Sequence, residues 1–156
     1  RLIRDAKCGF PDDPHRPGPT VVSTATLDTV ASWFAEMDLD EARRRFRANL
    51  ELRCDEAFYE ERLIRADGEP VPWRIGDVEI EALQPCVRCV VPGRQSMTGM
   101  RNHDFQSVFE ARRTATMPES SPRAAFQTPY SLTINTRYSG AIPAAVTVGD
   151  SVATGF

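Results

Sequence analysis

Residues 74–89 read RIGDVEIEALQPCVRC, and this stretch carries the clearest indication of the fold. From Val78 to Ala82, apolar residues alternate with glutamates, a period of two that is typical of a strand with one buried face. The Gly-Asp pair just before Val78 has the composition of a tight turn. The stretch therefore predicts a turn and a strand within 74–83, followed at once by two closely spaced cysteines.

The rest of the chain adds short strands. Pro70 and Pro72 are interpreted as an edge or a loop, because proline cannot donate a hydrogen bond to a neighbouring strand. A second Gly-Asp pair at 149–150 predicts another turn. Alternating or β-branched residues predict three further strands: 20–22, 49–53 and 131–138.

Three amphipathic helices are predicted from apolar residues at helical spacing: 24–37, 38–46 and 104–117. Thr24 or Thr26 is expected to cap the first helix, because a hydroxyl can accept a hydrogen bond from an unpaired amide there. Asp38 is expected to cap the second, with Glu41 in the position of a capping box. Asp104 is the expected cap of the third helix.

Length and composition predict one globular unit. The chain has 156 residues, 41% apolar and 26% charged, as in ordinary globular domains. We expect a single domain over 1–156 with an extended leading segment over 1–19, and a chain that begins at Arg1 is expected to be a fragment of a longer protein. Short strands without regular strand-helix alternation predict a mainly β fold with α (α+β), a bent or closed β-barrel with peripheral helices.

Charge and hydropathy argue against several partners. A net charge of -3 at pH 7 lacks the basic footprint of nucleic-acid binding. The apolar runs are far shorter than the roughly 20 residues of a membrane helix, so no membrane partner is expected. Four scattered cysteines are too few for a secreted disulfide scaffold, which favours a cytoplasmic location.

The basic residues are almost all arginine. Of 19 basic residues, only Lys7 is a lysine. One interpretation of this bias is a genome composition that favours arginine codons. A guanidinium can also hold phosphate or carboxylate through two hydrogen bonds, which lysine does less well, so some arginines are candidates for anion binding.

The cysteines of PCVRC, Cys86 and Cys89, leave several interpretations open. A structural zinc site usually has two C-x-x-C knuckles, and the chain has one. A thioredoxin-like dithiol needs a following helix, whereas residues 90–92 favour a strand. Both cysteines could be small buried apolar residues. Arg88 favours a working thiol instead, because a cation beside Cys89 stabilises the thiolate.

Four motifs in this order resemble the MOSC domain, named for the C-terminal domain of molybdenum cofactor sulfurase. They are ARRRFRANLEL at 42–52, RIGDVEIEALQPCVRCVVP at 74–92, FEARR at 109–113 and VGDSV at 148–152. The resemblance is strongest to the branch that includes the amidoxime-reducing component. It implies a largely β-barrel domain that binds molybdenum cofactor (molybdopterin).

The resemblance also implies roles for individual residues. Cys89 matches the thiolate that ligates molybdenum, a soft ligand that suits this metal, and would be the catalytic residue. Arg47, Asn49 and Arg88 would contact the pterin and its phosphate. Two residues in a strand-to-helix turn near the cofactor are further candidates, although helix capping is their expected duty: Ser23 and Thr24.

The implied activity is the reduction of N-hydroxylated or N-oxygenated compounds. Electrons would come from a separate electron-donor protein, because the sequence shows no flavin, haem or iron-sulfur motif. The alternatives are a sulfur carrier, in which Cys89 holds a persulfide received from a cysteine desulfurase, and a noncatalytic ligand-binding domain. Pyridoxal phosphate, used by the sulfurase domain of some relatives, is not expected here, because it needs a lysine and the only one is Lys7.

Overall fold

The computed structural model describes residues 15–139 and 145–154, so most of the predicted leading segment, with Lys7 and Cys8, lies outside the described residues. The helices are α1 (Thr24–Ala31), α2 (Leu39–Phe46) and α3 (Phe105–Thr116), with short 3-10 turns η1 (Tyr59–Leu63), η2 (Val91–Gly93) and η3 (Arg123–Ala125). The strands are β1 (Val21–Ser23), β2 (Leu50–Leu52), β3 (Val71–Ile75), β4 (Val78–Val87), β5 (Ser131–Tyr138) and β6 (Val152–Thr154).

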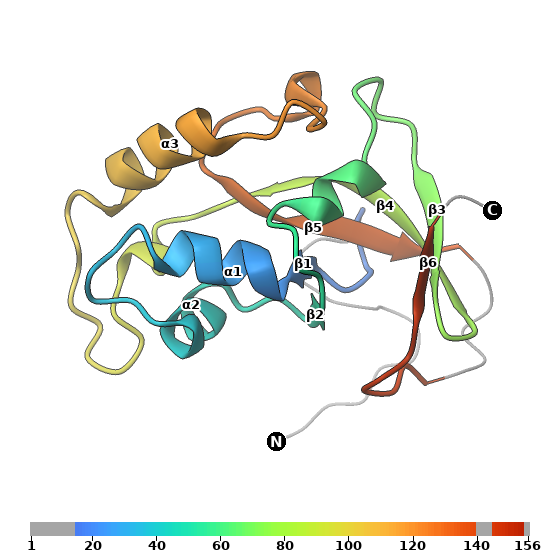
Figure 1. The fold of residues 1–156 in the computed structure, drawn as a ribbon, viewed down its shortest axis with the longest axis horizontal. Helices are drawn as coiled ribbons and strands as arrows, with labels where there is room; N and C mark the ends of the chain where they lie inside the picture. Colours follow the sequence, from blue (N-terminus) through green and yellow to red (C-terminus); the bar gives the residue numbers. More distant parts are fainter. Residues whose placement is uncertain (1–14, 140–144, 155–156) are drawn as a thin grey trace.

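The six described strands form one sheet in the order β2-β1-β5-β4-β3-β6. β1 and β2 pair in parallel, and the other neighbouring strands pair antiparallel. The sheet curls into a half-barrel. In Figure 1, β3 and β6 run steeply across the direction of β5, while the helices lie toward the other end of the molecule. The predicted α+β fold with a bent sheet and peripheral helices is confirmed.

The β3–β4 hairpin contains the predicted Gly-Asp turn, and the predicted strand after it, β4, is longer than expected. β3 begins at Val71 and includes Pro72, where the sequence predicts an edge or a loop. β6 pairs only with Trp73–Ile75 of β3. On the β6 side of Pro72 there is no described strand that could accept a backbone N–H hydrogen bond, which proline lacks. β4 runs on to Val87, because β5 pairs with it as far as that residue and Ser131.

The start of α1 corrects the predicted cap. Ser23 caps this helix, and neither Thr24 nor Thr26 does: the Ser23 Oγ accepts a hydrogen bond from Thr26 N at 3.1 Å. The Thr26 hydroxyl donates to the buried Glu60 at 3.0 Å instead. The helix also ends at Ala31 and does not continue to residue 37 as predicted. After Ala31 the backbone forms hydrogen bonds between residues three apart, such as Phe34 N to Ala31 O, in place of the four-residue spacing of an α-helix.

The starts of α2 and α3 lie where the sequence predicts them. Asp38 caps α2, and its Oδ1 accepts from Glu41 N at 2.7 Å. Asp104 occupies the cap position of α3, but its side chain makes no capping hydrogen bond. None of the described helices is long and apolar enough to cross a membrane.

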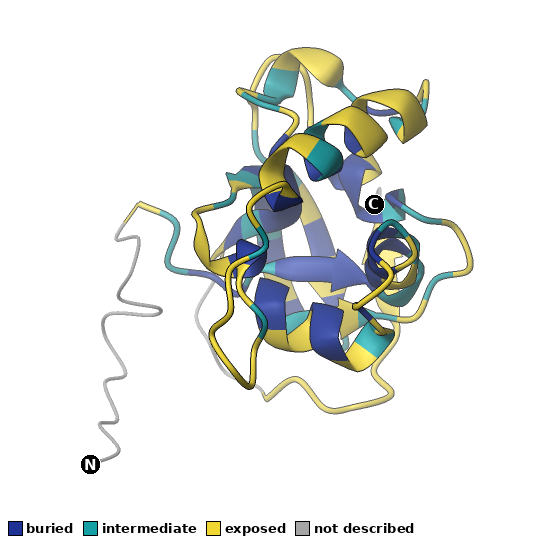
Figure 2. Ribbon diagram, turned by 90° about the vertical axis from the view of Figure 1, so that its left-hand side faces the viewer, coloured by how far each residue is buried: buried dark blue, intermediate teal, exposed yellow. Residues whose placement is uncertain are grey.

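Two clusters of buried apolar side chains hold the helices and the sheet together. One cluster lies between the helices and the sheet and includes Phe46 and Phe109. The other lies in the curl of the sheet around Trp73. Val22 belongs to the first cluster and its neighbour Val21 to the second, as the alternation of a strand requires. Figure 2 shows the buried residues on the sheet and on the inner sides of the helices around it.

Candidate functional site

A β-bulge in β4 turns two polar side chains toward a cavity. Even-numbered residues of β4 are buried as far as Ala82, and the next buried residue is Pro85. The register with β5 shifts after Ala82, so one extra residue, Leu83, is inserted there. Such an insertion moves the following side chains to the other face of the strand. Gln84 and Cys86 therefore line the cavity and do not enter the core.

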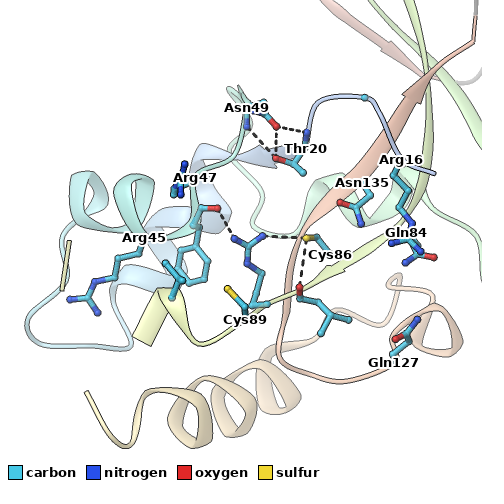
Figure 3. A pocket seen from close by; sticks show the side chains of 15 residues that line it. Arg16, Thr20, Arg45, Arg47, Asn49, Gln84, Cys86, Cys89, Gln127 and Asn135 are labelled. Carbon is cyan, nitrogen blue, oxygen red and sulfur yellow. Dashed lines mark hydrogen bonds between the residues drawn. The ribbon is translucent and has the colours of Figure 1, made fainter. Parts of the chain in front are cut away.

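The cavity has a volume of about 680 Å³ and lies between the end of α2, the strands β4 and β5 and the loop after β4 (Figure 3). Four arginines line it: Arg16, Arg45, Arg47 and Arg88. Its other polar groups are mainly four side-chain amides and two thiols: Asn49, Gln84, Gln127, Asn135, Cys86 and Cys89. No aspartate or glutamate is among the described lining residues. The described lining therefore carries positive charge without a balancing carboxylate, a composition that favours anions.

Arg88 connects the end of β4 with the end of α2. Its Nη2 donates to the backbone oxygen of Phe46 at 2.8 Å, and its Nη1 donates to the Cys86 Sγ at 3.3 Å. The guanidinium carbon lies 5.8 Å from the centroid of the Phe46 ring. The sequence interpretation pairs Arg88 with Cys89, whereas in the structure this guanidinium hydrogen-bonds to Cys86 (Figure 3).

Cys89 lies in the irregular segment that follows β4, and its side chain is exposed. Its backbone oxygen accepts a hydrogen bond from the Tyr130 hydroxyl at 3.2 Å. Burial, with a further contribution from the Cys89 thiol, raises the pKa of Tyr130 to about 12, so this phenol stays a neutral donor near pH 7. The backbone of Cys89 is therefore held in place while its sulfur remains open to solvent and to the cavity.

Arg47 and Asn49 reach the cavity from the segment between α2 and β2, and Arg88 lines the same cavity. Arg47 ends α2 in the left-handed conformation, with φ 53°. The Asn49 Oδ1 accepts from both the backbone N and the hydroxyl of Thr20, at 2.9 Å each. Its amide nitrogen donates to no other described residue and is left for a ligand.

Ser23 and Thr24 do not line the cavity. Ser23 is buried and caps α1. The Thr24 hydroxyl donates to Glu51 Oε1 at 2.7 Å, next to β2. Ser23 thus has the expected capping duty, whereas Thr24 neither caps α1 nor lines the cavity. Neither side chain joins the four predicted residues that line the cavity: Arg47, Asn49, Arg88 and Cys89.

Glu41 fixes α2 to the loop that follows η2. Its carboxylate accepts from Ser96 N at 2.8 Å, from Ser96 Oγ at 2.5 Å and from Arg45 Nε at 2.6 Å. Burial opposes the charged form, but these hydrogen bonds and one from Arg44 outweigh it and lower the pKa of Glu41 to about 2. Figure 3 shows the Arg45 guanidinium turned away from Cys86. Because this guanidinium also pairs with Glu41, Arg45 contributes less positive charge to the cavity than an unpaired arginine would.

The sequence did not draw attention to Gln84 on β4, to Asn135 on β5 or to the cavity residues before β1. Gln84 and Asn135 are polar residues within strands that contribute buried side chains to the core, and this is the one signal that could have drawn attention to them. Arg16 and Thr20 carry no such signal. They reach the cavity because β1 pairs with β5 and brings the preceding segment alongside.

The chemistry of the lining suits one anionic ligand that also meets a thiol. Guanidiniums and amides bind phosphate-like oxygens, and a thiolate binds a soft metal or attacks an electrophile. Among the described residues, no group of three or more His, Cys, Asp or Glu side chains could share a metal ion. Cys86 and Cys89 therefore have no described companions for a four-ligand zinc site.

Comparison with known proteins gives a family for this arrangement. The family model described as MOSC domain matches residues 19–153, which is most of the 156-residue chain. The matched region includes the cavity residues of α2, β4 and β5 and all four motifs quoted above. No curated protein sequence matches the chain.

Proposed function

The chain belongs to the MOSC domain family, and on that premise we propose that its cavity binds a molybdenum cofactor through Cys89. The observation that carries the proposal is the composition of the lining: guanidiniums, amides and two thiols, with no carboxylate among the described residues. When bound, the cofactor would supply a redox-active metal held by its dithiolene sulfurs. The cofactor carries a phosphate as well, and a lining without acids would accept that charge.

Each cavity residue then has a duty that follows from its position. The Cys89 thiolate would be the protein ligand to the metal, because it is the exposed sulfur of the two. Arg47 and the Asn49 amide would hold the phosphate, with Arg88 between them and the sulfurs. Cys86, which accepts a hydrogen bond from Arg88, would orient that guanidinium.

We further propose that the domain reduces N-hydroxylated or N-oxygenated compounds. In the overall reaction the N–O bond breaks, two electrons and two protons are taken up, and the reduced nitrogen compound and water are released. The electrons would come from a partner protein. The exposed position of Cys89 at the cavity supports this proposal, because both a small substrate and a partner could approach it from solvent.

Metal and pterin analysis tests the binding proposal. The protein is produced in a host that makes molybdenum cofactor, purified gently, and assayed for molybdenum by mass spectrometry and for pterin by fluorescence after oxidation. The wild-type protein should carry both, and Cys89→Ser should lose the metal. Cys54→Ser is the matched control, because Cys54 does not line the cavity. Full occupancy by zinc without molybdenum or pterin would contradict the proposal, as would molybdenum retained by Cys89→Ser.

A sulfur carrier is the second candidate, and the same exposed thiol favours it. Cys89 would accept one sulfur atom from the persulfide of a cysteine desulfurase and form a persulfide of its own. Intact-mass measurement after incubation with a desulfurase and cysteine distinguishes the two candidates. A gain of one sulfur atom that is absent in Cys89→Ser, on a chain that binds no molybdenum, favours the carrier.

A further inference from the structure

The cavity has a second polar end, away from Cys89. Gln84 and Asn135 lie directly opposite each other on β4 and β5, because the bulge at Leu83 brings them into register. Both side chains line the cavity, and both are half-buried. Figure 3 shows them with Arg16 at the end of the cavity that is remote from Cys89.

These two amides are unusual for their position. Neither side chain hydrogen-bonds to another described residue, although each lies on a strand of the sheet and is partly removed from solvent. A partly buried amide without a partner costs stability unless a ligand or water completes its hydrogen bonds. Two such amides side by side present donors and acceptors together, which matches the edge of a planar heterocycle with alternating amino, imino and carbonyl groups.

The spacing along β4 fits a ligand that reaches from this pair to the sulfurs. Gln84 and Cys86 are two residues apart on one face of the strand, which is about 7 Å. In a molybdopterin, the sulfurs and the phosphate lie at one end of the fused rings and the aminopyrimidinone edge lies at the other. With sulfur and phosphate at Cys89 and Arg47, the aminopyrimidinone edge is the part of the ligand that remains for the amides.

We propose that Gln84 and Asn135 recognise the aminopyrimidinone edge of the pterin by direct hydrogen bonds. This inference rests on the proposed function, because it assigns the far end of the same ligand. It makes the two amides specificity-determining residues, which select a pterin over other anions that the arginines could hold. A guanine base presents a similar edge, so the test must separate a pterin from a guanine nucleoside.

The test is a fluorescence titration of the full chain with 6-hydroxymethylpterin, a neutral probe that the guanidiniums do not attract through charge. The double variant Gln84→Met/Asn135→Leu should bind it about tenfold more weakly or worse than the wild type, because two hydrogen bonds are lost. Its affinity for inorganic phosphate should stay within about twofold, because the arginines remain. Gln106→Met is the matched control, since this glutamine lies on α3 and outside the cavity.

Three outcomes would overturn the inference. They are equal pterin binding by the double variant and the wild type, no binding by the wild type, and guanosine, which has the guanine edge but no phosphate, bound by the wild type at least as tightly as the pterin. If the double variant also binds phosphate more weakly, the titration is repeated with Gln84→Asn. This variant keeps the side-chain amide and only shortens the side chain, so it disturbs the rest of the cavity less. Loss of pterin binding supports the inference, and unchanged binding overturns it. Unaltered pterin binding contradicts only this inference, whereas absence of molybdenum from the wild type contradicts the proposed function.

Discussion

One residue that lines the cavity, Arg47, carries a local backbone cost. Arg47 adopts φ 53°, a left-handed conformation that costs a residue with a side chain roughly 1–2 kcal/mol. Glycine is the usual residue at such a helix end. An arginine here is unfavourable for the backbone alone, but it brings a guanidinium to the lining of the cavity. The strain is therefore consistent with a binding role.

Arg47→Gly should separate stability from binding. Removing the backbone strain should raise the free energy of unfolding by about 1 kcal/mol, measured by urea denaturation. Loss of the guanidinium should weaken binding of inorganic phosphate about tenfold, measured by calorimetry. Arg47→Ala is the control: it should lose the same affinity without the gain in stability. A glycine variant that binds phosphate as the wild type does would exclude Arg47 from the anion site.

At the scale of elements, α2 is held at three points. Asp38 caps its first turn, Glu41 ties it to Ser96 in the loop after η2, and Arg88 binds its last carbonyl. The sequence predicts the first contact, because a cap and its helix are neighbours in the chain. The other two join residues 55 and 42 positions apart, and the single sequence carries no sign of them.

The Glu41 contacts predict a dependence of stability on pH. The pKa of Glu41 in the folded protein, about 2, lies below its ordinary value of 4.5. The ionised carboxylate therefore stabilises the fold fully above pH 4.5, and this contribution is lost as the pH falls toward 2. Urea denaturation at pH 7, 4.5 and 3 should show a smaller acid loss in Glu41→Gln than in the wild type. The variant should be the less stable of the two at pH 7.

The matched control is Glu119→Gln, which changes an exposed carboxylate in the loop after α3. It should leave both the stability at pH 7 and the acid loss close to those of the wild type. If Glu41→Gln and the wild type lost equal stability between pH 4.5 and 3, the Glu41–Ser96 link would not govern the acid response.

Sequence reasoning predicted the elements well and their boundaries less well. Helix α2 and the strands β4 and β5 follow from periodicity, because each repeats one pattern over several residues. The bulge at Leu83 could not be predicted, since it depends on how β5 pairs with β4. The site divides in the same way. The motifs single out Cys89 and Arg47, which line the cavity, but they give no sign of Gln84 and Asn135, which the bulge positions.

At the scale of the whole molecule, a buried ion pair joins distant segments. Arg113 on α3 is completely buried and pairs with Glu61 of η1. Glu61 also accepts a hydrogen bond from Ser121 Oγ at 2.5 Å. The Arg113 guanidinium carbon lies 4.1 Å from the ring centroid of Phe58 and 5.4 Å from that of Phe126. One side chain thus connects α3, η1 and the loop before β5.

Replacing one partner of this pair should be more harmful than replacing both. Arg113→Met should lower the free energy of unfolding by about 3–5 kcal/mol, because it leaves the Glu61 charge buried with Ser121 as its remaining described partner. Adding Glu61→Leu should recover part of that loss, since it removes the unpaired charge. Arg112→Met, next to it on the exposed side of α3, should change stability by less than about 0.5 kcal/mol. The wild type, Arg113→Met, Glu61→Leu and the double variant form a double-mutant cycle, measured by urea denaturation. Additive effects would show that the two charges do not stabilise each other.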